Sequence, residues 1–263
     1  MKIALVQGKI YWENPRANLD YYDKLISQVS DHSRVIVLPE AFTTGFTMNI
    51  NKLSDIISYP VLDWMVEKAY EINKTIVGSV FVKENGHFYN RLYWVNSDGS
   101  YQYYDKRHLF GLAGENKIFT PGTRRVVVQQ DGLNFNLQIC YDLRFPVWSA
   151  NKYDKKSRTF DYDVLIYVAN WPAVRKNAYL PLLRARAIEN QAFVIWVNRI
   201  GRDAYMNTYS GDTRIIHPGG KVLATVKSSN EGILEYDLSL KELEAYRKKF
   251  LFGPDMDDFE VKI

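Results

Sequence analysis

Short apolar runs of strand length alternate along this chain with segments whose apolar residues recur at helical spacing. The runs Val35–Leu38, Val164–Ala169 and Phe193–Asn198 are apolar at almost every position, which predicts strands buried on both faces. Sheets that are covered on both faces carry helices between their strands. The pattern therefore predicts an α/β fold, in which a mixed sheet has helices packed on its faces.

Helix-start signals and tight turns complete this pattern. Asn14-Pro15 opens a predicted amphipathic helix, and Val61–Glu71 has the spacing of a second one. The turn Asn96–Gly99 joins the runs His87–Val95 and Tyr101–Tyr104, which predicts a β-hairpin. Further strands are expected at Lys2–Gln7, Thr75–Val82, Leu133–Ile139 and Gly232–Tyr236, a second hairpin at Arg214–His217 with Val222–Thr225, and helices just after Cys140, at Asn177–Gln191 and from Ser239. Without an internal repeat or a low-complexity linker, the chain is predicted to form one domain over residues 1–263.

Composition excludes several classes of protein. A single cysteine cannot form an internal disulfide, so the fold needs no oxidising compartment. No apolar run approaches the ~18 residues of a membrane span, and Lys2–Val6 is too short for the core of a signal peptide. A cytoplasmic protein is therefore expected. The net charge of +4 is small, and the densest basic cluster, Lys152–Arg158, has the composition of a solvated helix end, which argues against nucleic-acid binding.

The single cysteine, Cys140, lies where the expected strand Leu133–Ile139 meets the turn Tyr141–Pro146. A strand-to-helix corner presents a small nucleophile together with backbone N–H groups that point at the same spot. The polar residues around it, among them Asp142, suit the rim of a cleft better than a core. Cys140 is therefore a candidate nucleophile, with a small buried hydrophobic residue as the alternative. A nucleophilic thiol also needs a base or a cation beside it.

Three charged residues are candidates to activate this thiol. Glu40 follows Pro39 at the end of a strand with apolar residues on both sides, where desolvation raises the pKa of a carboxyl group and makes it a base near neutral pH. Helix capping or a solvated loop is the alternative for Glu40. Lys106 precedes aromatic and apolar residues, where its ammonium would hold a thiolate or an oxyanion, unless it is simply solvated. Glu115 follows Gly114, and a surface-loop role is equally open for it.

The segments that carry these residues resemble the Glu-Lys-Cys triad motifs of the nitrilase superfamily of carbon–nitrogen hydrolases. They are Leu38-Pro39-Glu40, Tyr104–Leu109 (YDKRHL) and Gln138–Pro146 (QICYDLRFP). The resemblance runs from Ile3–Gln7 to Gly232–Leu234 and is closest to the ω-amidase, or 2-oxoglutaramate amidase, branch. The segments similar to that branch are Thr43–Phe46, Ala169–Arg175, Arg184–Gln191 and Tyr209–Arg214. No triad position departs from the pattern, whereas the loop around Glu115 varies within the family.

The resemblance implies a four-layer α-β-β-α sandwich of the nitrilase type. It implies Cys140 as nucleophile, Glu40 as general base, Lys106 as the cation beside them, and Glu115 as a residue that positions Lys106 or the substrate. Lys106 and the N–H of Tyr141 would stabilise the oxyanion that forms when the thiol attacks an amide carbonyl. A thioester would form as ammonia leaves, and water activated by Glu40 would hydrolyse it. No metal and no organic cofactor is expected.

The substrate expected for the ω-amidase branch is the ω-amide of a short 2-oxo acid, 2-oxoglutaramate or 2-oxosuccinamate. Its free carboxylate needs a cation, and Arg175 is the first candidate because a guanidinium binds a carboxylate through two parallel hydrogen bonds. Arg144 is the second candidate, with an ion pair to Asp142 or another carboxylate as the alternative. Candidates for the pocket wall, with core packing as their alternative, are Phe46, Tyr141 and Trp171.

Other interpretations stay open at this point. One alternative is an enzyme for another amide-type substrate, namely an aliphatic amide, an N-carbamoyl amine or a nitrile. The other is a non-catalytic binding protein that keeps the same fold. A preference for an anionic amide over a neutral amide of equal length separates the first group from an ω-amidase. The family implies a homodimer, and the aromatic but acidic tail Phe250–Ile263 is predicted to pack at the subunit interface.

Overall fold

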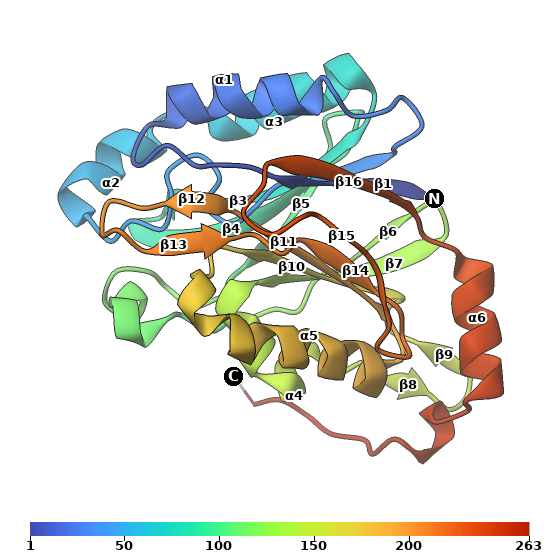
Figure 1. Cartoon of the computed structure of the whole chain (residues 1–263). Helices are drawn as coiled ribbons and strands as arrows, with labels where there is room; N and C mark the ends of the chain where they lie inside the picture. Colours follow the sequence, from blue (N-terminus) through green and yellow to red (C-terminus); the bar gives the residue numbers. More distant parts are fainter. Residues whose placement is uncertain (263) are drawn as a thin grey trace.

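The computed structural model describes residues 1–262 as four layers in the order α-β-β-α (Figure 1). Two six-stranded sheets lie face to face, and helices cover the outer face of each sheet. The four-layer sandwich expected from the family resemblance is thereby confirmed. The apolar pattern alone predicted only one mixed sheet, because a strand buried on both faces has the same composition in either sheet.

The first sheet has three parallel strands at its centre and antiparallel strands at both edges. Its strands, in spatial order, are β16 (Gly232–Asp237), β1 (Lys2–Gln7), β2 (Val35–Val37), β3 (Thr75–Glu84), β4 (His87–Val95) and β5 (Tyr101–Asp105). The hairpin predicted around Asn96–Gly99 is present as β4 and β5.

The second sheet repeats this plan, with three parallel strands flanked by antiparallel ones. Its strands, in spatial order, are β15 (Val222–Thr225), β14 (Arg214–Ile216), β11 (Phe193–Asn198), β10 (Val164–Ala169), β7 (Leu133–Ile139) and β6 (Val127–Gln130). Two small hairpins stand apart from the sheets: β8 (Tyr153–Asp154) with β9 (Thr159–Phe160), and β12 (Ile200–Arg202) with β13 (Thr208–Ser210).

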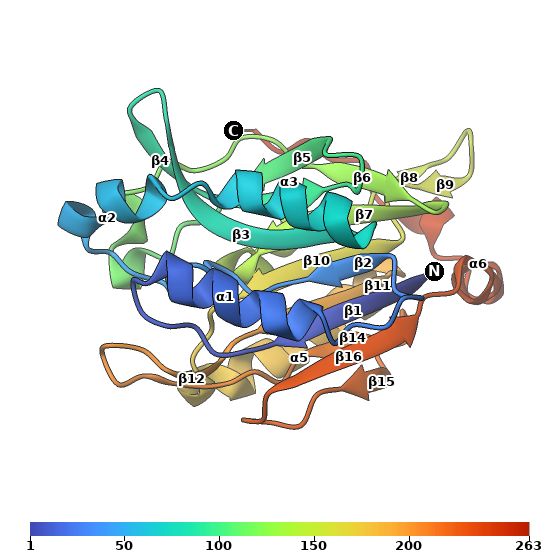
Figure 2. The ribbon, with the colours of Figure 1, turned by 90° about the horizontal axis from the view of Figure 1, so that it is seen from above.

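Helices α1 and α3 both lie over the first sheet, and α5 lies over the second (Figures 1 and 2). The helices are α1 (Pro15–Ile26), α2 (Ile50–Ile57), α3 (Val61–Ile72), α4 (Pro146–Ser149), α5 (Lys176–Asn190) and α6 (Leu240–Lys249). The Asn14 side chain accepts a hydrogen bond from the Ala17 N–H and so caps α1, as the Asn14-Pro15 signal predicts. Within residues 1–262, no helix has the length and apolar character needed to cross a membrane.

Side chains alternate between the two faces of each strand and so divide the interior into layers. In β1, Ile3 and Leu5 face the second sheet, whereas Ala4 and Val6 face the helices of the first outer layer. Successive side chains point to opposite faces of a strand, so an apolar run can serve both layers. The larger apolar cluster joins the layer between the sheets to the layer under α5, and it includes every apolar residue of β10. Both sheets are therefore held rigidly up to the ends of their parallel strands.

Some predictions were wrong or incomplete. The basic cluster Lys152–Arg158 is not a helix end but the tip of the exposed β8–β9 hairpin, where Asp154 accepts hydrogen bonds from the N–H groups of Lys156 and Ser157. Helix α2 was missed because it buries only Leu53 and Ile56, too little to stand out in the sequence. The tail lies along the molecule below α5, and its last residue, Ile263, lies outside the described residues.

A substitution at Gly122 tests how closely the backbone packs at the end of β5. Its N–H donates to the carbonyl of Lys106, and a Cβ at this position would lie 2.0 Å from the carbonyl oxygen of Asp105. Since backbone cannot move aside as a side chain can, we expect Gly122→Ala to lower the free energy of unfolding by about 2–3 kcal/mol, measured by urea denaturation. Gly111→Ala is the control, because its backbone is not left-handed and the nearest atom that its Cβ would meet is Oδ1 of Asn116 at 3.5 Å, an ordinary contact. An equal effect of the two substitutions would contradict the steric account.

Candidate active site

The polar residues of the site follow the carboxyl ends of parallel strands from both sheets. Glu40 comes shortly after β2, Cys140 directly after β7, and Asn170 directly after β10. The Glu40 N–H donates to the carbonyl of Ala169 at 3.4 Å, which joins the two sheets at this end. Ligand sites of α/β folds lie at such strand ends because loops from several strands meet there. Residues far apart in the sequence are in this way brought to one place.

Cys140 occupies a strained corner. It begins the short 3₁₀ turn Cys140–Arg144 with a φ of +46°, a left-handed conformation that a residue with a side chain adopts at a cost. The preceding residue stays in the sheet, where Ile139 pairs with Val168 of β10. The abrupt change of direction turns the thiol out of the sheet at the end of the strand. The sequence-based expectation of a strand-to-turn corner at Cys140 is confirmed.

Asp142 holds this corner in place. Its buried carboxylate accepts hydrogen bonds from the Ile139 N–H at 3.0 Å, the Tyr104 hydroxyl at 2.8 Å and the His108 N–H at 2.9 Å. The His108 ring adds a fourth contact through Nδ1 at 2.8 Å. A buried carboxylate needs such a set of donors to replace its lost hydration. The sequence marked Asp142 only as a polar neighbour, since its partners on another segment leave no local signal.

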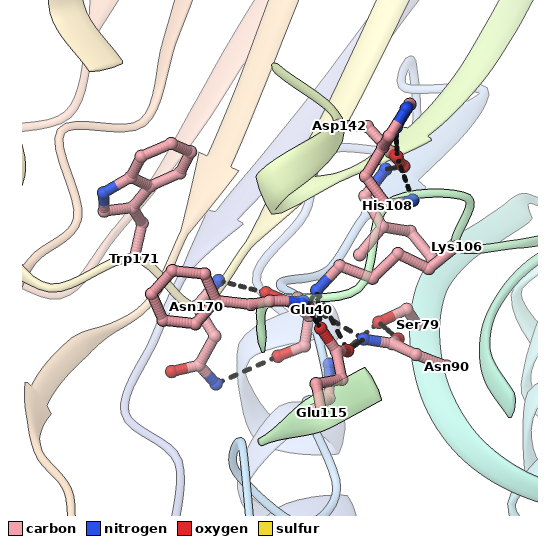
Figure 3. A network of polar contacts seen from close by, with 12 residues as sticks. Glu40, Ser79, Asn90, Lys106, His108, Glu115, Asp142, Asn170 and Trp171 are labelled. Atoms are coloured by element: carbon pink, nitrogen blue, oxygen red, sulfur yellow. Dashed lines mark hydrogen bonds and ion pairs between the residues drawn. The ribbon is translucent and has the colours of Figure 1, made fainter. Parts of the chain in front are cut away.

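Lys106 lies between two buried carboxylates (Figure 3). Its Nζ is 2.8 Å from Oε1 of Glu40 and 3.0 Å from both carboxylate oxygens of Glu115. All three side chains are at most 1% exposed. Glu115 also accepts a hydrogen bond from the Phe110 N–H. The solvated or surface-loop alternatives for Glu40, Lys106 and Glu115 are therefore wrong.

Two asparagines complete the cluster and were missed in the sequence. The Asn170 N–H donates to Oε2 of Glu40 at 2.7 Å. The Asn90 side chain donates to Oε1 of Glu40 at 2.9 Å and to Oε1 of Glu115 at 3.2 Å. Asn90 stands within the hairpin strand β4, where an asparagine carries no signal of its own. Only the Ala169–Arg175 segment, recognised by resemblance, pointed to Asn170.

Burial and charge shift the pKa values of this cluster. Burial raises the pKa of the Cys140 thiol well above its ordinary range, and the neighbouring Glu40 carboxylate raises it further, while Lys106 and the Asn170 N–H act in the opposite direction. Burial also raises the pKa of Glu115, as does the charge of Glu40. Burial disfavours the Lys106 ammonium, but the carboxylates outweigh this and raise its pKa. The resting cluster thus holds a protonated thiol beside a permanent ammonium ion.

A cavity of about 250 Å³ opens beside Cys140 and Lys106. Its other lining residues include Arg175, whose guanidinium lies 4.8 Å from the centre of the Phe110 ring, and the buried Asp203. Arg144 does not line this cavity. It is exposed, with its guanidinium 5.2 Å from the centre of the Trp171 ring, and it pairs with no carboxylate within residues 1–262. The ion pair considered between Arg144 and Asp142 is therefore absent.

All three aromatic candidates line the cavity. Phe46 has its ring centre 5.0 Å from Nζ of Lys106, and half-buried Tyr141 packs edge-on against Phe110. Trp171 serves both of the roles considered for it, because it also packs against Trp196 in the core. The cavity wall is thus largely aromatic, and its charged members are Lys106, Arg175 and Asp203. Within residues 1–262, no group of His, Cys, Asp or Glu side chains is arranged to hold a metal ion.

Comparison with known proteins finds relatives along the whole chain. A family model described as carbon–nitrogen hydrolase matches residues 2–248. Omega-amidase YafV of Escherichia coli K12 is 40% identical over 99% of this chain and 98% of its own length. The 2-oxoglutaramate amidase of Bacillus subtilis is 34% identical over 97% of this chain and 96% of its own length. A crystal structure from Xanthomonas campestris, of a superfamily protein with an arsenic adduct in its active site, has 36% identity, a TM-score of 0.94 and coverage of 100% of this chain and 99% of that one.

Asp142→Asn tests the hydrogen bonds that the Asp142 carboxylate accepts at the Cys140 corner. The new amide would turn an NH₂ group toward donors that now meet a carboxylate oxygen, so buried N–H groups would lose their acceptor. We expect the free energy of unfolding to fall by about 2–4 kcal/mol, measured by urea denaturation.

Asp161→Asn is the matched control for this substitution. The Asp161 carboxylate is 44% exposed and lies 3.9 Å from Arg125, so its loss should change the free energy of unfolding by less than about 1 kcal/mol. Equal stability of wild type and Asp142→Asn would contradict the structural role given to the hydrogen bonds of Asp142.

Proposed function

This chain belongs to the carbon–nitrogen hydrolase family and is an enzyme that acts on amides, and from that premise we propose that it is an ω-amidase. The substrate is the ω-amide of a short 2-oxo acid, 2-oxoglutaramate or 2-oxosuccinamate, and the products are the dicarboxylate and ammonia. The observation that carries the proposal is one cavity lined by Lys106, Cys140 and Arg175, with Glu40 buried against Lys106 behind its wall. The family match confirms the resemblance recognised in the sequence and removes the non-catalytic binding protein.

The first half-reaction transfers the amide's acyl group to sulfur. The raised pKa of Cys140 keeps the thiol protonated at rest, so attack needs a base: the thiol gives its proton to Glu40 as sulfur attacks the amide carbonyl. The carbonyl electron pair becomes an oxyanion, which the Lys106 ammonium and the Tyr141 N–H stabilise. When the oxyanion collapses, the C–N bond breaks and Glu40 returns its proton to the departing nitrogen. Ammonia leaves, and a thioester on Cys140 remains.

The second half-reaction releases the acid. Glu40, ionised again, takes a proton from a water molecule as its oxygen attacks the thioester carbonyl. The same donors stabilise the second oxyanion, the C–S bond breaks, and the proton on Glu40 passes to the sulfur. Glu115 positions Lys106 throughout, because its carboxylate stays 3.0 Å from Nζ. One water is consumed, and the enzyme returns to its starting state.

Arg175 anchors the free carboxylate of the substrate in this proposal. It is the cavity-lining arginine, whereas Arg144 is exposed and stands outside the cavity. The cavity volume of about 250 Å³ suits a substrate with a four- or five-carbon chain rather than a large amide. Phe46, Tyr141 and Trp171 form the wall around the chain of the substrate. A neutral amide would leave the guanidinium without an anionic partner.

The cytoplasmic homodimer expected from the sequence stays part of the proposal. The described end of the tail folds against α4 and the end of α5, where Met256–Glu260 and Val147 line a shared groove. Val147 of α4 lines this groove and is about half exposed, which leaves apolar surface beside the tail. This surface is the part of the molecule that we assign to the subunit interface.

Cys140→Ala tests the nucleophile and the substrate together. We expect the wild-type protein to release ammonia from 2-oxoglutaramate and the variant to lose this activity, because no other thiol exists in the chain. Ammonia release is measured with a neutral aliphatic amide in parallel. Activity on the neutral amide alone would keep the nucleophile and overturn the substrate, and activity that survives in Cys140→Ala would overturn the nucleophile.

Arg175→Lys tests the carboxylate anchor. Lysine keeps the charge but loses the paired N–H groups, so KM for 2-oxoglutaramate should rise at least tenfold while kcat changes less than about threefold. The control is Arg144→Lys, which changes an exposed arginine that does not line the cavity and should leave KM unchanged. An unchanged KM in Arg175→Lys would remove the assignment.

A further inference from the structure

Asn90 connects the two carboxylates of the site through a single amide group. It lies in β4, is 1% exposed, and its Nδ2 donates to Oε1 of Glu40 at 2.9 Å and to Oε1 of Glu115 at 3.2 Å (Figure 3). A primary amide has two N–H groups on this nitrogen, so it can serve two acceptors at once. A hydroxyl, or a protonated carboxyl group, has only one hydrogen to give. Among uncharged side chains of this size, asparagine suits the position for that reason.

The Ser79 hydroxyl fixes the orientation of the Asn90 amide. Ser79 Oγ accepts a hydrogen bond from the Ala41 N–H at 2.9 Å, and its own hydrogen is directed to Oδ1 of Asn90 at 3.0 Å. Because Oδ1 receives this donor, the NH₂ end must face the carboxylates. The chain of contacts begins at Ala41, the residue directly after Glu40. The backbone that carries the carboxylate and the amide that binds it are therefore fixed together.

The two oxygens of the Glu40 carboxylate accept different numbers of hydrogen bonds. Oε1 receives two donors, Nζ of Lys106 at 2.8 Å and Nδ2 of Asn90 at 2.9 Å. Oε2 receives one, the Asn170 N–H at 2.7 Å. An oxygen that already accepts two directed hydrogen bonds has no lone pair free for a proton, whereas an oxygen with one does. The proton that Glu40 takes up belongs on Oε2.

We propose that Asn90 is a positioning residue, whose two N–H groups hold Glu40 and Glu115 together and leave Oε2 of Glu40 as the oxygen that exchanges protons with Cys140. The proposal rests on the proposed function only for the role of Glu40 as base. Asn90 does not touch the cavity and acts through the two carboxylates. The titratable and charged groups that face Glu40 are Lys106, Glu115 and Cys140, with Arg175 and Asp203 across the cavity.

Asn90→Asp, nearly the same size and shape, is the test. An ionised carboxylate in place of the amide would repel both Glu40 and Glu115, and a protonated carboxyl group there would give a hydrogen to only one of them. Either way the ionised form of Glu40 loses stabilisation relative to the protonated form. The acid limb of kcat/KM for 2-oxoglutaramate should move to higher pH by at least one unit, and kcat/KM at pH 7 should fall at least tenfold.

Alkylation of Cys140 by iodoacetamide gives a second readout that needs no amide substrate. An ionised aspartate at position 90 adds negative charge near the thiol and makes the thiolate harder to form, and a Glu40 that is held protonated cannot take the thiol's proton. In either case the alkylation rate between pH 7 and 9 should fall at least fivefold in Asn90→Asp. This result would stand even if 2-oxoglutaramate proved not to be the substrate. Because the chain has one cysteine, the modification can be followed by mass without ambiguity.

Asn151→Asp is the matched control, because Asn151 is also buried but binds Asn190 and Tyr162 away from the site. It should leave both pH profiles unchanged. If Asn90→Asp does not fold, Ser79→Ala replaces it, since losing the hydroxyl frees the amide to turn; a smaller shift in the same direction is expected. Profiles of a folded Asn90→Asp, or of Ser79→Ala in its place, that superimpose on the wild type would overturn the proposal.

Discussion

The ion cluster formed by Lys106, Glu40 and Glu115 is the interaction on which the rest of the site depends. Three charges with almost no exposure to solvent can remain ionised only if they compensate one another at hydrogen-bond distance. Removing the ammonium would leave two buried carboxylates in mutual repulsion, joined by a single neutral amide from Asn90. The loops after β2, β5 and β7 must therefore converge, and the cavity exists where they do so.

The two sheets supply the rigidity that this convergence requires. Ala41, next to Glu40, and Cys140 both have positive φ, at +48° and +46°, and each such residue costs about 1–3 kcal/mol. Such strain persists only where the flanking chain is fixed. Here β2 is extended past its end by hydrogen bonds to β3, from the N–H of Leu38 to Val77 and from that of Phe42 to Ser79. The strained corners are consequences of well-held strands, and they direct the reactive groups toward each other.

How far the sequence predicted this arrangement depends on the range of each interaction. The strands Val164–Ala169 and Phe193–Asn198 could be predicted to the residue, because burial on both faces leaves a continuous apolar run. Asp142 and Asn90 could not, since their partners stand 38 and 50 residues away and a single polar residue in a strand or turn carries no period. Cys140, Glu40 and Lys106 were found because their motifs resemble those of a family.

In the proposed function, Arg175 has an electrostatic role in addition to lining the cavity. With Glu40 and Glu115 ionised, the cluster around Lys106 carries one more negative charge than positive, which would repel an anionic substrate. Burial raises the pKa of Glu115 and so eases this excess without removing it. The guanidinium of Arg175 adds a positive charge to the lining of this cavity of about 250 Å³, where the buried Asp203 adds a further carboxylate. In the proposed function, an amide that carries its own carboxylate is therefore bound at Arg175, the cavity-lining cation that stands outside the Lys106 cluster.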